Sequence, residues 1–323
     1  MTQKNWRERT FLGIAFILTV TCGAWLILAA RYEALPARPT LLMWIAGSTC
    51  AVLVIHRFST WLAGGRSEMT EAHNAVLNGQ ATKLENLLNE DPGQANATDE
   101  HGLTPLHLAA LQGRSRMATM LIARGADAEA REHRFGFTPL HMVCSQRYEP
   151  VVAVICPKMV EEIDAVLSDK PPIPIVEELL RAGSDPNAQA GFSRTPVHMA
   201  AVGGEASTIE LLLDNGGDAS ATDDLGFTPL HYAAFGGGGQ VARLLLEAGA
   251  DPTATAEMDY TPLHTAAEKG TEGVARAILE AGLDPNIPTR EGRTAVALAN
   301  QHGHHSLEQL IRQKGGKDSV ERG

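Results

Sequence analysis

One short motif recurs along this chain at a nearly fixed spacing, and that spacing constrains the fold more than any other feature. The motif reads Thr-Pro-Leu-His, with valine once in place of leucine, and its clear copies begin at Thr104, Thr138, Thr195, Thr228 and Thr261. The numbers of successive threonines differ by 34, 57, 33 and 33. A period of this size is typical of stacked structural units that contact only their neighbours, and not of a single globular core.

The residue types within one copy predict two helices. Threonine is a favourable N-cap, and proline suits the first helical position because its missing N–H would have no partner there. A glycine nine residues after the threonine, such as Gly113 or Gly270, is expected to end this helix. A second helix with paired aliphatic residues, for example Leu212-Leu213, should end at a later glycine of the same copy, such as Gly216. Two such helices bury their apolar faces only against neighbouring copies, so the motif predicts an all-α solenoid.

Together, Thr-Pro-Leu-His-x-Ala-Ala, the later Leu-Leu-x-x-Gly-Ala-Asp and the regular period resemble ankyrin repeats. The resemblance implies an ankyrin-repeat solenoid of about seven helix-turn-helix repeats, placed at residues 67–317 and followed by a tail at 318–323. Degenerate copies that begin at Thr70 and Thr294 are expected to cap its two ends. Because this family serves unrelated partners, the resemblance implies a protein-binding scaffold without naming what it binds.

The third repeat is interrupted by an insertion. The step from Thr138 to Thr195 is longer than the other steps, and removing the excess brings Gly183 back into register with the other copies. The insertion is therefore predicted between the two helices of this repeat, at about residues 146–172. Apolar residues from Met159 to Leu167 follow helical spacing, so an amphipathic helix is expected there. Such a helix either covers the side of the stack or forms a docking element.

Residues 1–66 are predicted to anchor the chain in a membrane. Residues 11–30 contain no charge and residues 40–58 are mostly apolar, so a transmembrane helix is expected at about each of these positions. All four tryptophans lie in this part of the chain, the last of them at Trp61, as is typical of segments near membrane interfaces. The alternative is that the first apolar run is a signal peptide, cleaved after Ala30.

The basic residues that flank the two spans predict their orientation. Three precede the first span, two lie at or after the end of the second (Arg57 and Arg66), and two lie in the loop between the spans. This excess favours both ends of the hairpin in the cytoplasm. A cleaved first run would still leave the repeats on that side. We therefore expect a multi-pass membrane protein with two spans and with cytoplasmic ankyrin repeats.

The charge distribution and the motifs narrow the possible functions. Residues 1–66 carry seven basic and two acidic side chains, a net +5, and the remaining chain carries 20 basic and 36 acidic side chains, a net −16. Repeats of this charge argue against nucleic acid as a partner. No catalytic, cofactor or phosphate-binding motif is evident, so we predict no enzyme activity, no cofactor and no small-molecule substrate.

The repeated histidines could suggest catalysis or metal binding, but their pattern favours a structural role. Six of them stand once per repeat, each three residues after the threonine, which predicts hydrogen bonding within the fold rather than catalysis or metal binding. They are His73, His107, His141, His198, His231 and His264. A denser group, His302, His304 and His305, has no cysteine or carboxylate that would support metal binding. We predict no metal site and no catalytic residue.

The aromatic residues define the predicted binding surface. Proteins that resemble ankyrin line a concave groove with their turn tips and with the exposed side of each first helix. All five phenylalanines of the repeat region fall at such positions, and other large apolar residues join them. The predicted protein-binding residues are Phe135, Phe137, Phe192, Phe227, Phe235, Tyr260, Leu225, Met258, Leu111 and Val202. The competing interpretation is that these side chains pack on their neighbours, but a contiguous apolar set more often marks an interface.

From these observations we expect a membrane-tethered scaffold that holds a cytoplasmic protein partner on its concave groove. Two alternatives stay open. The repeats could regulate or inhibit a membrane enzyme or channel that the helical hairpin contacts, or the chain could be a secreted effector whose hairpin inserts into a foreign membrane.

Overall fold

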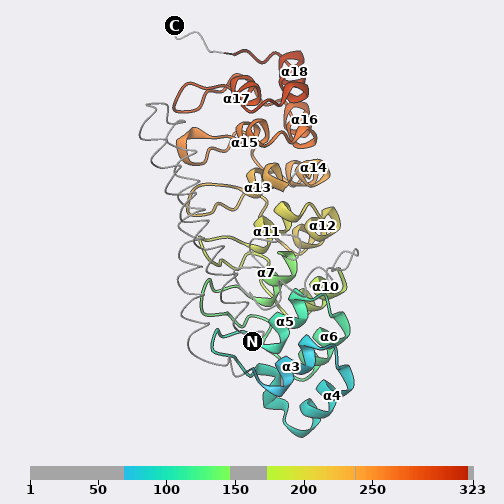
Figure 1. The fold of residues 1–323 in the computed structure, drawn as a ribbon. Helices are drawn as coiled ribbons and strands as arrows, with labels where there is room; N and C mark the ends of the chain where they lie inside the picture. The colour runs from blue at the N-terminus through green and yellow to red at the C-terminus, as the bar shows by residue number, and fades with distance from the viewer. Residues whose placement is uncertain (1–68, 146–172, 237, 319–323) are drawn as a thin grey trace, which may run out of the picture. The chain divides into compact units, whose positions relative to one another are not determined.

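The computed structural model describes residues 69–145, 173–236 and 238–318. In these residues the chain forms seven pairs of helices that follow one another along a stack (Figure 1). The predicted spans at 11–30 and 40–58 and the predicted insertion at 146–172 lie outside the described residues. Within the described part of the chain, no helix is both long enough and apolar enough to cross a membrane.

Each pair consists of a first helix that begins after the repeat threonine and of a second helix that precedes the next turn. The first helices are α3 (Glu71–Leu77), α5 (Pro105–Leu111), α7 (Pro139–Cys144), α11 (Pro196–Gly203), α13 (Pro229–Gly236), α15 (Pro262–Lys269) and α17 (Ala295–Gln301). The second helices are α4 (Ala81–Glu90), α6 (Ser115–Ala123), α10 (Ile173–Arg181), α12 (Ala206–Asp214), α14 (Gly239–Glu247), α16 (Glu272–Glu280) and α18 (His305–Gln313). In the described ranges two short 3₁₀ helices lie in the turns, η1 (Pro92–Asn96) and η3 (Glu257–Asp259). The predicted all-α solenoid is confirmed.

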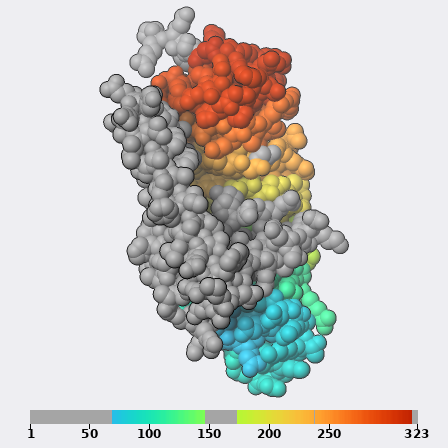
Figure 2. Space-filling view, in the orientation of Figure 1, coloured from blue at the N-terminus to red at the C-terminus, as the bar shows by residue number. Residues whose placement is uncertain are grey.

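Equivalent helices of successive repeats pack on one another. In the middle of the stack, α13 contacts α11 and α15, while α14 contacts α12 and α16. α10 contacts α6, α7 and α12, so α7 and α10 form the helix pair of the third repeat although many residues separate them. In the space-filling view the repeats follow one another as bands from blue to red (Figure 2). Each internal repeat is therefore stabilised by its two neighbours.

The local sequence explains where the first helices begin and end. Thr104, the N-cap of α5, has an extended backbone, and its hydroxyl accepts a hydrogen bond from the backbone N–H of His107. The histidine side chain in turn binds the backbone N–H of the threonine, so the two residues form a capping box. α11 and α15 end at Gly204 and Gly270, whose left-handed backbone suits glycine.

One continuous core runs the length of the stack, from Ala72 to Ile311. The first helices contribute fully buried alanine pairs, such as Ala233 and Ala234, and the second helices contribute fully buried leucines, such as Leu245. Small side chains let neighbouring first helices approach closely, and the leucines fill the remaining space. The core thus holds the helices in register and leaves the turn tips at the surface.

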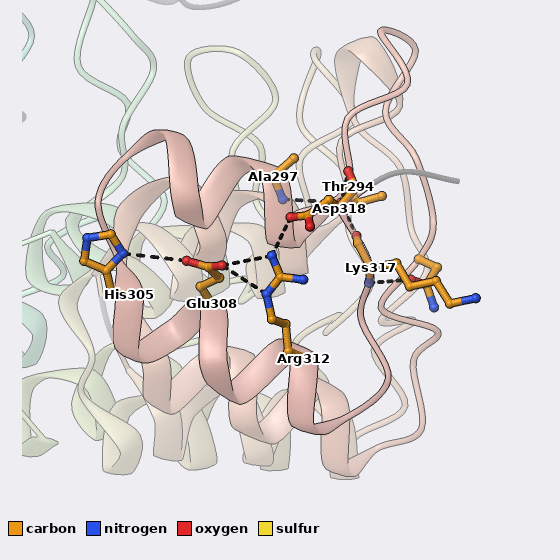
Figure 3. Close-up of polar contacts among 8 residues, drawn as sticks. Thr294, Ala297, His305, Glu308, Arg312, Lys317 and Asp318 are labelled. Carbon is orange, nitrogen blue, oxygen red and sulfur yellow. Dashed lines mark hydrogen bonds and ion pairs between the residues drawn. The ribbon is translucent and has the colours of Figure 1, made fainter. Parts of the chain in front are cut away.

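The end of the stack is closed by the chain that follows α18 (Figure 3). The backbone N–H of Lys317 donates to the side-chain oxygen of Asn286 at 2.9 Å, and the Thr294 hydroxyl donates to the carbonyl of Lys317 at 2.7 Å. Ala297 stands where the internal repeats have their histidine, so the last repeat extends no such side chain towards a further unit. Ion pairs join Arg312 to Glu308 and to Asp318. Residues 314–318 thereby supply hydrogen-bond partners to polar groups of the last repeat, as a following repeat does for the internal ones.

Candidate protein-binding surface

Buried histidines join each repeat to the next. The Nδ1 atom of His231 accepts a hydrogen bond from the backbone N–H of Thr228 at 3.1 Å, and its Nε2 donates to the carbonyl of Tyr260, in the next repeat, at 3.1 Å. A backbone carbonyl only accepts and a backbone N–H only donates, so this imidazole is neutral and carries its proton on Nε2. The histidines with a Thr partner and a carbonyl partner in a later turn are His73, His107, His141, His198, His231 and His264.

Burial keeps these imidazoles neutral. Removal from water disfavours the charged form and lowers the pKa of five of them to about 4, namely His107, His141, His198, His231 and His264. Burial also lowers the pKa of His73. With one ring nitrogen protonated and the other accepting hydrogen bonds, neither offers a free lone pair to a metal ion. The predicted structural role of the six histidines is confirmed by these bonds.

The turns between repeats end in a row of tips that backbone hydrogen bonds link together. The residue three positions before each repeat threonine accepts, through its carbonyl, from an N–H of the next tip. The donors, from the tip that follows Thr104 onwards, are His133, Gly191, Asp224, Glu257 and Arg290, at distances between 2.6 and 3.0 Å. This ladder holds four apolar side chains in register along the stack, and we call them the tip row: Phe135, Phe192, Leu225 and Met258.

The structure divides the ten predicted contact residues into two groups. Four are at most 9 % exposed and belong to the core, so their predicted exposure is wrong: Phe137, Phe227, Tyr260 and Leu111. For the three aromatic residues the physical reason is a ring contact within the repeat, since the rings of Phe137, Phe227 and Tyr260 lie 5.4, 5.2 and 5.6 Å from the histidine of the same repeat, and Leu111 packs in the core at the end of α5. Phe192 and Leu225 are 49 % and 40 % exposed. The half-buried remainder comprises Phe135, Phe235, Met258 and Val202.

The tips are built in two ways, and one of them strains the backbone. Before Thr228, the buried carboxylate of Asp223 accepts from the N–H groups of Leu225 and Phe227, and Gly226 supplies the left-handed turn. The tip before Thr195 has Ala190 in place of the carboxylate and Ser193 in place of the glycine. Phe192 and Ser193 there adopt φ of 64° and 58°.

The tip before Thr261 repeats this second arrangement, with Met258 at φ 62° and Asp259 at 59°. A left-handed conformation costs a residue with a side chain about 1–2 kcal/mol. Strain of this kind is concentrated at functional sites in proteins. Phe192 therefore combines a strained backbone with a ring that is half exposed to water.

Next to Phe192, cationic groups and aromatic rings alternate across three repeats. The Arg194 guanidinium lies 5.1 Å from the centre of the Phe192 ring and 5.7 Å from that of Tyr232. The Tyr232 and Phe235 rings are 6.1 Å apart, and the Lys269 ammonium lies 5.5 Å from the Phe235 ring. We call these five residues the cation–aromatic chain. It links the tip row to the surface of the first helices α13 and α15.

Sequence reasoning missed three members of this chain. Arg194 stands directly before a repeat threonine, where most other copies have an apolar residue, and this departure was the available signal. Tyr232 is buried, and its hydroxyl donates to Asp223 at 2.8 Å, which fixes the orientation of the ring. Lys269 lies at the end of α15, where helices commonly carry a cation, so its position alone indicates nothing unusual.

Comparison with known proteins identifies the family. The model described as Ankyrin repeats (3 copies) matches residues 72–169 and 163–256, and the model of a single Ankyrin repeat matches residues 258–290. The chain belongs to the ankyrin-repeat family. Ankyrin repeats generally act as non-enzymatic modules for protein interaction, which suggests a protein-binding scaffold whose partner is unknown.

Individual relatives of this ankyrin-repeat chain cover only part of its length. It is 36% identical over 119 residues to the human ankyrin repeat domain-containing protein SOWAHD, a stretch that is 34% of this chain and 33% of that relative. The chain thus matches about a third of that protein. The crystal structure of the human ASB11 ankyrin repeat domain is similar with a TM-score of 0.63 and 23% identity, and the match covers 78% of this chain and 100% of that one. This second likeness shows the fold alone.

In the described part of this ankyrin-repeat chain, no group of three or more His, Cys, Asp or Glu side chains is placed to hold a metal ion. Cys144 is buried, and burial raises the pKa of its thiol far above the usual range, so the thiol is unreactive. The Nε2 atom of His304 donates to the carbonyl of Glu268 at 3.0 Å, because a carbonyl only accepts. The surface that stands out is therefore the tip row with its adjoining rings.

Proposed function

We propose that this ankyrin-repeat chain is a membrane-tethered scaffold that holds a protein partner on the tip row and on the adjoining cation–aromatic chain. The observation that carries the proposal is Phe192, whose ring is 49 % exposed on a left-handed backbone. Burying such a ring in an interface gains about 1.5–3 kcal/mol, whereas leaving it in water gains nothing. Aromatic and arginine side chains are also the residues that most often dominate binding energy.

Photo-crosslinking tests where the partner lies. A photoreactive amino acid placed at Phe192 or at Phe235 is expected to crosslink to the same protein in intact cells. The matched control is Arg243, which is exposed on the second helix α14. A partner that crosslinks from Arg243 but from neither of the other positions would locate the binding surface on the second helices and contradict the proposal.

Phe192→Gly separates binding from folding. We expect this change to weaken partner binding by about 2 kcal/mol, because it removes a central ring. The free energy of unfolding should stay the same or rise by about 1 kcal/mol, because glycine relieves the left-handed strain. Phe227→Ala is the contrasting variant, since loss of a core ring should lower the free energy of unfolding by about 3 kcal/mol. Binding titrations and urea unfolding of both variants measure these effects.

The membrane tether is supported by the sequence of residues 1–66. An apolar run of twenty residues without charge suits a bilayer, and the flanking basic residues favour cytoplasmic repeats. The chain is expected to stay with membranes after alkaline carbonate extraction, and a reporter fused after Gly323 should read cytoplasmic. Release by carbonate would contradict the tether without touching the binding surface, and a reporter on the other side would contradict the orientation.

A further inference from the structure

The cation–aromatic chain contains a positive charge, on Arg194, that makes no direct ion pair with the described residues. No carboxylate there lies within ion-pair distance of Arg194, and the buried Nε of this side chain has no hydrogen-bond partner. The guanidinium lies against the Phe192 and Tyr232 rings and contacts the Tyr232 hydroxyl, which donates to the buried Asp223 carboxylate at 2.8 Å, so Asp223 compensates its charge only through that hydroxyl. A partly buried cation without a direct ion pair is stabilised further when a ligand supplies an anion.

The neighbouring charges exclude a polyanion as that ligand. Asp224 is exposed on the tip next to that of Arg194, and Glu257 is exposed one tip further along, so the two carboxylates flank Leu225 of the tip row. A nucleic acid or an anionic membrane surface that reached Arg194 would also meet these carboxylates, and like charges repel. A ligand with only one or two carboxylates avoids this repulsion.

The second cation of the chain lies one repeat further on. Lys269 pairs with the adjacent Glu268 at 3.1 Å and keeps its ammonium against the Phe235 ring. The two cations therefore bracket the rings of Tyr232 and Phe235. An extended polypeptide has side chains on alternating sides, so one segment can place a carboxylate beside an apolar side chain along such a surface.

We propose that the cation–aromatic chain binds an extended acidic segment of the protein partner, in which a carboxylate pairs with Arg194 and an adjacent apolar or aromatic side chain packs on Phe192 and Phe235. This inference rests on the proposed function and adds the chemistry of the partner. A basic residue flanking the acidic one would face Asp224 and Glu257. Charge complementarity of this kind determines which segment binds and in which register.

Selection from a phage library of random peptides, against the full chain in lipid nanodiscs, tests the proposal. The selected peptides should share an aspartate or glutamate next to an aromatic or aliphatic residue. Arg194→Gln is expected to weaken their binding by about tenfold, whereas Arg194→Lys keeps the charge and should weaken it less. Added salt should weaken binding to the wild type more than binding to Arg194→Gln. Arg276→Gln, on the second helix α16, is the matched control and should bind normally.

The outcomes distinguish this inference from the proposed function. Selected peptides without an acidic residue, whose binding is lost in Phe192→Gly and kept in Arg194→Gln, would overturn the acidic partner and leave the binding surface in place. Selected peptides that bind Phe192→Gly and Arg194→Gln as tightly as they bind the wild type would count against both the acidic partner and the proposed binding surface. So would a selection that yields no peptide. Stronger binding of phosphatidylserine vesicles or of single-stranded RNA than of the peptides would overturn the proposal. A peptide carrying lysine for its carboxylate should regain binding to Arg194→Glu, which excludes simple misfolding of the arginine variants.

Discussion

Lowering the pH from 6.5 towards 4 is expected to unfold the repeat stack in one steep transition. Five buried histidines have a pKa of about 4 in the folded chain, against 6.5 when they are free in water. Between these two values the unfolded chain binds protons that the folded chain does not. Stability from neutral histidines is therefore fully present above pH 6.5 and is lost as the pH falls through this window.

The size of the effect follows from the number of histidines that act together. Each one changes the free energy of unfolding by about 1.4 kcal/mol per pH unit within the window, so five produce a slope of about 7 kcal/mol per pH unit. A domain is typically stable by about 5–15 kcal/mol. The fall is thus large enough to unfold the stack before the folded histidines themselves begin to titrate.

Urea titrations followed by circular dichroism at a series of pH values measure this slope. His305→Gln is the matched control, because it makes the same exchange at a side chain that is 75% exposed. His231→Gln should lower the stability at neutral pH and reduce the slope by about 1.4 kcal/mol per pH unit. A free energy of unfolding that stays constant down to pH 4 would show that the imidazoles are not held neutral by the fold.

Gly236→Ala is expected to lower the free energy of unfolding by about 3 kcal/mol, although the change adds a single methyl group. Gly236 ends α13, and a Cβ atom there would overlap the carbonyl oxygen of Val202 and lie 2.8 Å from its carbonyl carbon. Both atoms belong to the backbone of the preceding repeat, so no side-chain rotation relieves the overlap. The first helices of two repeats would have to move apart.

Gly273→Ala, in the neighbouring repeat, is the matched control. A Cβ atom at Gly273 would meet nothing closer than the Gly239 Cα at 3.4 Å, which is an ordinary contact. Gly273 lies inside α16, where alanine is favoured over glycine by about 0.5–1 kcal/mol. This variant should therefore be as stable as the wild type or slightly more stable. Equal losses in both variants would mean that the first helices are not in backbone contact at Gly236.

A structural feature of this protein can be predicted from its sequence when the interactions that produce it are local. The helix starts were predictable because Thr104 and His107 bond each other's backbone N–H groups within four residues, and Pro105 between them has no N–H to satisfy. The period was predictable because identical units must meet at identical intervals. The structural role of the histidines was predictable for the same reason. A side chain that recurs at one position of successive repeats is expected to stabilise the repeat itself.

Only the tertiary structure decided which rings form the candidate surface. Phe227 and Phe192 both lie in turns before a repeat threonine, two positions apart in the repeat numbering. Phe227 packs on His231 and is buried, whereas Phe192 stands on a left-handed tip and is half exposed. Arg194 belongs to the candidate surface because its guanidinium contacts the ring of Tyr232, which lies in the next repeat. The exposure of a side chain and the pairing of its charge depend on the residues that it contacts in the neighbouring repeat. These contacts cannot be read from the sequence of a single repeat.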